Sequence, residues 1–178
     1  MIRIQPLHPE TLEAAIQLAE TCFTLDFKTD PNRIRSSIET SLYPDRYPDR
    51  FGGRLVADGI HYWLALDQER VIGMVGYYIL TEDQQDSAWI SWYCVDPAYR
   101  GKKIGLQLLN FIIEKAKSLG KTHLRLFSSD IPAEHRAHAV YKKRGFRPFK
   151  EPHYDPKTKT DFIYLQLNLS TTPSLQKT

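Results

Sequence analysis

The spacing of hydrophobic positions divides the chain into segments of two kinds. Apolar residues recur at helical spacing in four segments, and they alternate with polar residues or run together in six others. The predicted helices cover residues 9–23, 31–42, 104–119 and 132–143. The predicted strands cover residues 2–7, 60–66, 71–80, 88–95, 122–127 and 160–169. Gly120 and Gly145 follow two of the helices, where glycine commonly ends a helix.

The order of these segments determines the expected fold class. A strand–helix–strand unit over 88–128 requires two parallel strands, whereas the hairpin turn at 67–70 joins antiparallel ones. We therefore expect an α/β fold with a mixed, mostly antiparallel sheet, flanked by helices, that contains one central parallel strand pair. Residues 1–169 are expected to form a single domain. The polar tail at 170–178 is expected to be disordered.

Two segments carry more specific expectations. The loop 43–53 repeats Tyr-Pro-Asp-Arg and ends in two glycines, so it is predicted to lack regular structure. A loop of this length inside a compact domain is more often functional than idle.

In the strand 88–95, simple alternation predicts one face formed by Trp89, Ser91, Tyr93 and Val95, and an opposite face formed by Ile90, Trp92 and Cys94.

Composition narrows the class of protein. Of the 178 residues, 42% are hydrophobic and 25% charged, as in ordinary globular proteins, and a net charge of +3 does not demand a nucleic-acid partner. Cys22 and Cys94 have no metal-ligand spacing and form no disulfide framework, so they are expected to be reduced core residues. The N-terminus has no signal-peptide pattern, and no apolar run reaches the ~20 residues of a membrane span. A cytoplasmic setting without membrane contact is expected.

The turn before the helix 104–119 carries the most informative chemistry. Gly101 and Gly105 allow the backbone to approach a ligand, and Arg100, Lys102 and Lys103 add positive charge at a helix N-terminus. Such a turn binds phosphate groups. The spacing of a nucleoside triphosphate loop is absent, and no glycine-rich dinucleotide motif follows an early strand. What remains is a pyrophosphate held by successive backbone amides, with little need for a bound metal ion.

The run from Val95 to Gly105 resembles the acetyl-CoA motif of the GCN5-related N-acetyltransferase (GNAT) family. The family pattern is Gln/Arg-x-x-Gly-x-Gly/Ala. Arg100 matches its first position and Gly105 its last, whereas Lys103 stands where the middle glycine is usual.

A second segment is similar to another motif of that family. It reads Ala137-x-x-x-Tyr141-x-x-x-Gly145-Phe146. Family members often carry Asn seven residues before this tyrosine, where the present chain has Glu134. Because the two motifs occur in the family's order, separated by a strand, the resemblance covers about residues 2–169.

The resemblance implies a GNAT-like fold and an N-acetyltransferase that uses acetyl-CoA as co-substrate and no metal. It implies direct attack of a primary amine on the thioester while both substrates are bound. The strand before the turn would separate from its neighbour, and the backbone of Tyr93, Cys94 and Val95 would hold the pantetheine and the carbonyl. Tyr141 would act as general acid on the thiolate. The pyrophosphate would be bound by Arg100, Gly101, Lys102, Lys103, Ile104 and Gly105.

The sequence does not identify a single general base. An attacking amine must lose its proton, because an ammonium has no lone pair. The candidate residues are Glu82, Asp83, Asp86, Ser91, Glu134 and His135, and a base acting through ordered water is an alternative. His135 and His138 are spaced like a metal-binding pair, but no third ligand is evident, so both are expected to be surface histidines.

The acceptor is expected to be a small-molecule or peptide amine. It would lie near the first two helices, the loop 43–53 and the turn 82–87. The composition of that loop suggests a cationic, partly apolar amine that contacts Asp45, Asp49, Tyr43, Tyr47 and Phe51.

Two other functions stay open from the sequence. One is a non-catalytic module that binds coenzyme A. The other is a nucleic-acid binder using the basic run 142–150, although no RNA or DNA module motif is present, so no nucleic-acid partner is expected. Exposed final strands often pair in such folds, which makes a homodimer an alternative to a monomer.

Overall fold

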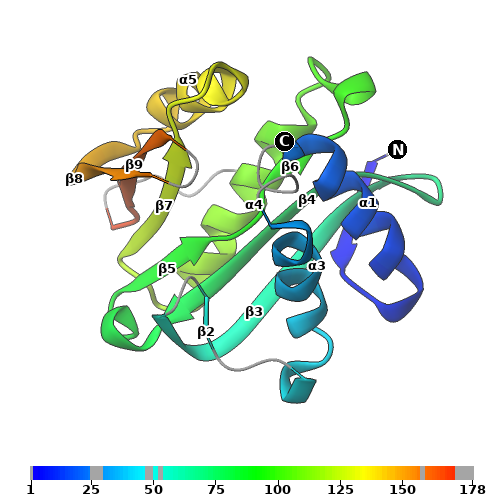
Figure 1. The fold of residues 1–178 in the computed structure, drawn as a ribbon, viewed down its shortest axis with the longest axis horizontal. Coiled ribbons are helices and arrows are strands. Elements are labelled where there is room, and N and C mark those ends of the chain that lie inside the picture. Colours follow the sequence, from blue (N-terminus) through cyan, green and yellow to red (C-terminus); the bar gives the residue numbers. More distant parts are fainter. Residues whose placement is uncertain (1, 25–29, 47–49, 52–53, 157–158, 171–178) are drawn as a thin grey trace.

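A mixed sheet forms the centre of the molecule. The computed structural model describes residues 2–24, 30–46, 50–51, 54–156 and 159–170. Within these residues, nine strands pair in the order β1-β3-β4-β5-β7-β9-β8, with β2 beside β3 and β6 beside β4 (Figure 1). The strands are β1 (Ile2–Pro6), β2 (Arg50–Phe51), β3 (Arg54–Asp67), β4 (Arg70–Leu80), β5 (Ser87–Ile90), β6 (Cys94–Val95), β7 (His123–Ser129), β8 (Arg147–Asp155) and β9 (Thr160–Asn168).

The parallel pair lies where the strand–helix–strand pattern predicts it. Strands β5 and β7 pair in parallel over Ser87–Trp89 and His123–Arg125, and the other described pairings are antiparallel. The chain crosses between them through α4. The predicted fold class is therefore confirmed. The helices are α1 (Leu12–Cys22), α3 (Pro31–Thr40), α4 (Ile104–Ser118) and α5 (His135–Lys143).

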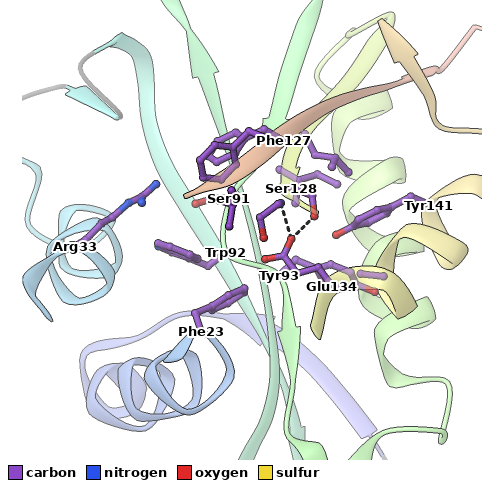
Figure 2. Close-up of a pocket in the computed structure, with 15 residues that line it drawn as sticks. Phe23, Arg33, Ser91, Trp92, Tyr93, Phe127, Ser128, Glu134 and Tyr141 are labelled. Carbon is purple, nitrogen blue, oxygen red and sulfur yellow. Dashed lines mark hydrogen bonds between the residues drawn. The ribbon is translucent and has the colours of Figure 1, made fainter. Parts of the chain in front are cut away.

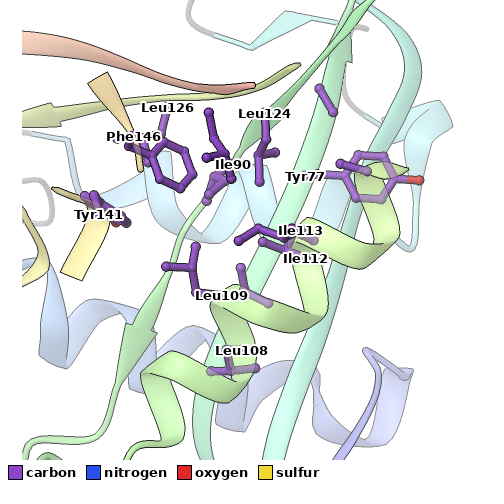
Figure 3. Packing of buried hydrophobic residues seen from close by; sticks show 14 of the residues in the cluster. Tyr77, Ile90, Leu108, Leu109, Ile112, Ile113, Leu124, Leu126, Tyr141 and Phe146 are labelled. Carbon is purple, nitrogen blue, oxygen red and sulfur yellow. The ribbon is translucent and has the colours of Figure 1, made fainter. Parts of the chain in front are cut away.

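Helices cover both faces of the sheet (Figure 1). Helix α4 presents an apolar stripe to one face, and α5 adds Tyr141 to the same cluster. Figure 3 shows part of this cluster, in which α4 contributes Leu108, Leu109, Ile112 and Ile113. Helices α1 and α3 pack on the opposite face in a second cluster. Because both faces are covered, β4 is buried at every position after Arg70, which agrees with its unbroken apolar sequence.

Backbone conformation determines where α4 begins and ends. Lys103 precedes the helix with a φ of 62°, the left-handed conformation in which glycine is usual. Gly120 follows the helix with a φ of 72°, and its N–H donates to the carbonyl of Lys117. Lys115 and Lys117 lie in the last turn, where positive charge stabilises the helix dipole. The prediction for Gly120 is confirmed.

The segment expected as one strand over 88–95 is instead two short strands joined by an irregularity. Tyr77 pairs with Ile90 and Met74 with Cys94, so three steps along β4 correspond to four steps along its partner. One extra residue reverses the alternation of side chains. Trp89, Trp92 and Cys94 therefore lie with the α1–α3 cluster, whereas Ile90, Tyr93 and Val95 lie with the α4 cluster. The prediction that Trp89 shares a face with Tyr93 is wrong.

Other boundaries also differ from the sequence prediction. Strand β3 begins at Arg54 rather than residue 60. The loop 43–53 contains a 3₁₀ turn at Pro44–Arg46, and Arg50–Phe51 pair with β3, so the prediction that it lacks regular structure is wrong for these residues. The backbone of Arg50 and Phe51 pairs with that of β3, which satisfies its polar groups. Strand β8, which the periodicity did not delimit, lies at the edge of the sheet.

Some predictions concern residues outside this description. Tyr47, Asp49 and the segment 171–178 lie outside the described residues. Among the described helices, none is both long and apolar enough to cross a membrane. Cys94 is buried, Cys22 is half-buried, and both are free thiols.

Candidate active site

The turn that precedes α4 is shaped by side chains on both sides of it. The Asp96 carboxylate accepts a 2.9 Å hydrogen bond from the Ala98 N–H and a 2.8 Å bond from Arg70. The Arg100 side chain donates to the carbonyl of Val95 at 3.3 Å, and the Lys102 ammonium lies 4.5 Å from the centre of the Tyr99 ring.

Beyond these contacts the turn presents backbone amides and positive charge. Gly101 has a φ of 81°, and with Lys103 at 62° the backbone turns twice in the left-handed region before the helix. The first N–H groups of any helix point out of its N-terminus, since they have no acceptor within it. Arg100, Lys102 and Lys103 are exposed beside them. This arrangement favours an anion such as a pyrophosphate.

Tyr93 connects the irregular strand to α4. Its hydroxyl donates a 2.7 Å hydrogen bond to the carbonyl of Gly105. A Cβ at Gly105 would lie 2.8 Å from this hydroxyl, so only glycine fits there without displacing the ring. Burial raises the pKa of Tyr93, and the phenol stays a hydrogen-bond donor at ordinary pH.

A pocket opens where the parallel strands separate. Strands β5 and β7 pair only from Ser87 to Trp89, and beyond this point residues 90–93 and 126–129 line opposite sides of the opening. Strand β6 pairs with β4 on one edge, and no described strand pairs with its other edge. Figure 2 shows the pocket, which is lined by Phe23, Arg33, Ile90, Ser91, Trp92, Tyr93, Leu126, Phe127, Ser128, Ser129, Glu134, Ala137, Tyr141, Thr160 and Phe162.

Tyr141 lies at one end of this pocket (Figure 2). Its ring centre is 6.1 Å from that of Tyr93 and 5.6 Å from that of Phe146. Burial raises the pKa of Tyr141 well above its ordinary value, and the negative charge of Glu134 acts in the same direction. The hydroxyl therefore remains protonated over the working range of most enzymes. It can donate a hydrogen bond, and then its proton, to a thiolate that forms beside it, because the same burial also raises the pKa of the departing thiol.

Glu134 is held in the pocket by the end of β7. Its carboxylate accepts a 2.8 Å hydrogen bond from the Ser129 N–H and another from the Ser128 hydroxyl. The same hydroxyl lies 2.9 Å from His138 Nε2, and burial lowers the pKa of His138. Among the described residues that line the pocket, Glu134 provides the carboxylate and Arg33 the permanent cation.

Ser91 lies in the strand irregularity and reaches the pocket from the α1–α3 side. Its hydroxyl is 2.6 Å from that of Tyr62, which is buried on β3. Next to it, Trp92 donates its indole N–H to the Ser37 hydroxyl at 2.5 Å. These bonds fix both residues of the irregular segment against α3 and β3.

Comparison with known proteins identifies the family. A family model described as the acetyltransferase (GNAT) family matches residues 13–146, about the stretch from α1 to the end of the second motif. The chain belongs to this family. The GNAT domain match contains both the turn before α4 and Tyr141, and acetyl-CoA is the co-substrate of GNAT enzymes.

Solved GNAT structures share the fold over nearly the whole chain. An acetyltransferase of the GNAT family from Staphylococcus aureus matches with a TM-score of 0.69 and 21% identity, covering 95% of this chain and 99% of that one. A GNAT acetyltransferase from Elizabethkingia anophelis with acetyl-CoA bound matches with a TM-score of 0.62 and 20% identity, covering 94% and 97%. An aminoglycoside 6′-N-acetyltransferase complexed with coenzyme A matches with a TM-score of 0.71 and 14% identity, covering 96% and 99%.

The structure brings most of the GNAT residues expected from the sequence together. Tyr93 and Tyr141 both line the pocket, and the hydrogen bond from Tyr93 to the Gly105 carbonyl connects the pocket lining to the first turn of α4. The Cys94 side chain instead lies in the α1–α3 cluster, and Cys94 is absent from the pocket lining. The roles of these residues in binding acetyl-CoA stay predictions, as does the expected absence of a metal.

The candidates for the general base separate into two groups. Ser91 and Glu134 line the pocket. Asp83 instead accepts a 2.6 Å hydrogen bond from the Trp89 indole and pairs with Arg125 at 3.0 Å, which makes it a structural residue.

The remaining acidic and histidine candidates lie outside the lining of the pocket. Glu82 and Asp86 are absent from it, and Asp86 accepts a hydrogen bond from Ser87. His135 is exposed and bonds to the carbonyl of Asp130 at 3.0 Å. His138 is half-buried rather than on the surface, because it packs beside Ser128.

Several lining residues were not identified from the sequence. Asp45, expected to contact the acceptor, is exposed on the 3₁₀ turn and is absent from the lining, whereas Arg33 of α3 is part of it. Phe127 and Ser128 come from the end of β7, and Phe162 from β9. Polar residues after the parallel strand are the one signal that could have pointed to them, since ligands bind beyond the carboxyl ends of such strands.

Proposed function

We propose that this protein transfers the acetyl group of acetyl-CoA to the primary amine of a small molecule or peptide, by direct attack while both substrates are bound. The observation that carries the proposal is the opening between the irregular strand and β7, which has Tyr141 at one end. The Tyr93 side chain lines this opening and bonds to Gly105 in the first turn of α4. A thioester bound between the basic turn and the opening would have its sulfur near a protonated phenol.

Two segments of the chain would hold different parts of the cofactor. Arg100 and Lys102 add charge to the amides at the helix N-terminus, where a pyrophosphate would lie. The backbone of residues 93–95 would then meet the pantetheine and the thioester carbonyl. Backbone N–H groups directed at that carbonyl would stabilise the oxyanion that forms during attack.

The proposed reaction balances with the groups in the pocket. The neutral amine nitrogen forms a bond to the thioester carbon, and the bond from that carbon to sulfur breaks. The sulfur leaves as a thiolate and takes the proton of the Tyr141 hydroxyl. The proton lost by the nitrogen passes through water and restores the Tyr141 hydroxyl, and the Glu134 carboxylate stabilises the positive charge on nitrogen until that proton leaves. One fold relative, the aminoglycoside 6′-N-acetyltransferase, is named for an amine acceptor.

Calorimetry with acetyl-CoA and a thiol-release assay on a panel of amines test this proposal together. We expect acetyl-CoA binding, thiol release with at least one amine, and weaker binding in Arg100→Ala and Lys102→Ala. Lys117→Ala is the matched control, because this lysine lies in the last turn of α4, at the opposite end of the helix from the basic turn. Binding without release on any amine would instead identify a non-catalytic coenzyme A module.

A further inference from the structure

Only one of the two carboxylate oxygens of Glu134 is bonded to the protein. Oε2 accepts both hydrogen bonds, from the Ser129 N–H and from the Ser128 hydroxyl. Among the described residues, none bonds to Oε1, and the one buried side-chain oxygen or nitrogen without a partner is Asn110 Oδ1. Oε1 of Glu134 is therefore open, and the residue lines the pocket. Its negative charge is stable there, because Glu134 directly precedes α5.

Ser128 and His138 form a directional series of hydrogen bonds behind Glu134. The Ser128 hydroxyl has one proton, which it donates to the carboxylate. Its oxygen also lies 2.9 Å from His138 Nε2, so it accepts a hydrogen bond there and His138 carries a proton on Nε2. The series therefore runs from His138 on α5, through Ser128 on β7, to Glu134. It fixes Oε2 against the end of β7 and leaves Oε1 for a ligand.

The nitrogen of the acceptor must come close to Glu134. The proposed transfer places the thioester sulfur near Tyr141, and Figure 2 shows Glu134 between Trp92 and Tyr141. A primary alkyl amine has a pKa of about 10, so it enters the pocket as an ammonium at neutral pH. A cation that leaves water needs an anionic partner, and Glu134 is the carboxylate among the described residues of the lining.

Aromatic rings form the walls next to this carboxylate. Phe23 and Trp92 have ring centres 4.8 Å apart, and Phe127 and Phe162 meet edge to face at 5.7 Å. The Trp92 indole is fixed by its hydrogen bond to Ser37. Rings of this kind favour a flat, apolar ligand body, and a flexible polar chain would leave their surface poorly covered.

We infer that Ser128 and His138 are positioning residues for the acceptor, which hold Glu134 so that its Oε1 binds the primary ammonium of a flat, apolar molecule. This inference rests on the proposed acetyl transfer, since that reaction requires an amine beside Tyr141. Glu134 contacts the substrate, whereas Ser128 and His138 act through the carboxylate. The ammonium loses its proton from this position before the neutral nitrogen attacks the thioester.

Two probes of nearly equal shape test the inference by binding. Benzylamine carries the ammonium on a flat ring, and benzyl alcohol has an uncharged hydroxyl in its place. Binding to the full-length protein with coenzyme A present is measured by calorimetry and by tryptophan fluorescence. We expect benzylamine to bind the unmodified protein about tenfold or more tightly than benzyl alcohol.

Glu134→Gln should remove this preference and leave the affinity for benzyl alcohol nearly unchanged, because the amide oxygen can still accept from Ser128 and Ser129. Glu151→Gln is the control, since this exposed acid of β8 does not line the pocket. It should keep the preference. Equal binding of the two probes, no binding of benzylamine, or an unchanged preference in Glu134→Gln would overturn the inference.

The positioning role is tested at the two residues behind Glu134. Ser128→Ala and His138→Leu should each reduce the preference for benzylamine by about threefold or more, because the carboxylate loses the donors that fix it. His138→Gln keeps an N–H donor and should retain most of the preference. His135→Gln is the control, since this exposed histidine bonds to the Asp130 carbonyl instead.

Nitrogen-15 NMR provides a second readout of the same series. The neutral imidazole of His138 should carry its proton on Nε2, and Ser128→Ala should shift the resonance of this nitrogen. A neutral form with the proton on Nδ1 would contradict the directional series. Equal preferences in His138→Leu and His138→Gln would likewise overturn the positioning role.

The same probe separates this inference from the proposed function. With acetyl-CoA in place of coenzyme A, we expect thiol release on benzylamine, with a higher KM for this amine in Glu134→Gln. An intact binding preference with no thiol release on any amine contradicts the catalytic proposal and leaves the ammonium-binding role of Glu134 supported. Release on other amines but neither binding nor release with benzylamine overturns the inference alone.

Discussion

The Tyr93 hydroxyl donates a 2.7 Å hydrogen bond to the Gly105 carbonyl and occupies the space that a Cβ at Gly105 would need. The contact joins the irregular strand to the first turn of α4. These are the two segments expected to hold the pantetheine and the pyrophosphate of one cofactor molecule. The relative position of the two segments therefore depends on the contact between the Tyr93 phenol and Gly105.

Gly105→Ala is expected to weaken acetyl-CoA binding, because the added methyl group must displace the Tyr93 ring and with it the hydrogen bond to α4. The dissociation constant from calorimetry measures the effect. Gly105→Ala is also made in a Tyr93→Phe background, which lacks the hydroxyl and keeps the ring. Without the hydroxyl, the nearest atoms to the new Cβ are Val95 Cγ2 at 3.5 Å and the Tyr93 ring carbon at 3.7 Å, which are ordinary contacts.

In that background, Gly105→Ala should have little additional effect on binding. Coupling of this kind is expected only for residues in direct contact. An equal loss of affinity in both backgrounds would show that the methyl group acts in another way.

Lys103 adopts the left-handed conformation in which glycine is usual. Lys103→Gly should leave the free energy of unfolding within about 1 kcal/mol, because relief of strain offsets the greater freedom of the unfolded chain. Lys103→Val should destabilise the protein by more than about 1 kcal/mol, since a β-branched residue tolerates this conformation poorly. Urea denaturation measures both. Equal stability of the two variants would argue against a backbone role for this position.

Tyr141→Phe is expected to lower kcat about a hundredfold, the lower end of the usual contribution of a general acid, with little change in the KM for acetyl-CoA. The phenylalanine ring preserves the packing against Tyr93 and Phe146. Tyr154→Phe is the control, because this tyrosine of β8 is 56% exposed. Thiol-release kinetics distinguish them, and an unchanged kcat in Tyr141→Phe would exclude the proton donor proposed here.

Burial raises the pKa of Tyr62, Tyr93 and Tyr141 in the folded protein. A group whose pKa is raised on folding contributes stability below its unfolded pKa of about 10, and that stability is lost as the pH rises further. The free energy of unfolding should therefore fall between about pH 9 and pH 11. The fall should be smaller in Tyr141→Phe and unchanged in Tyr154→Phe. A pH-independent stability over this range would contradict the buried, protonated state of these phenols.

Gly76 on β4 makes room for Tyr62 on β3. A Cβ at this position would clash with the Tyr62 ring and lie 2.7 Å from the His61 carbonyl oxygen. Gly76→Ala should destabilise the protein by about 1–3 kcal/mol through overpacking, and it should raise the acceptor KM, because the hydroxyl of Tyr62 holds Ser91 in the pocket. Denaturation and steady-state kinetics test the two effects. Tyr62→Leu should reduce the Gly76→Ala penalty, and no reduction would contradict the steric cause.

The basic turn and the helix after it were predictable because local features determine them. The apolar spacing of α4, the glycine after its end and the charges before its start act within a few residues of one another. The position of Tyr141 on a helix also followed from its motif. The parallel pair followed from connectivity, since a strand, a helix and a second strand can pair in sequence only by crossing the sheet.

The irregularity between Ile90 and Cys94 was not predictable from alternation. One extra residue in the pairing with β4 exchanges the faces of the side chains, and only the pairing partner reveals it. Arg33 and Phe162 illustrate a related limit. They are far apart in the chain and meet in one pocket because α3 and β9 pack on either side of the strand opening.

The sequence by itself determined the order of the elements and the basic turn before α4, because short-range periodicity and glycine positions control these features. Only the tertiary structure decided which side chains face the acceptor. That outcome depends on strand register and on contacts between segments distant in sequence, such as Tyr93 with Gly105 and Tyr62 with Ser91. A register change of one residue moves every side chain of a strand to the opposite face of the sheet. The order of neighbouring residues in the sequence does not show whether such a change occurs.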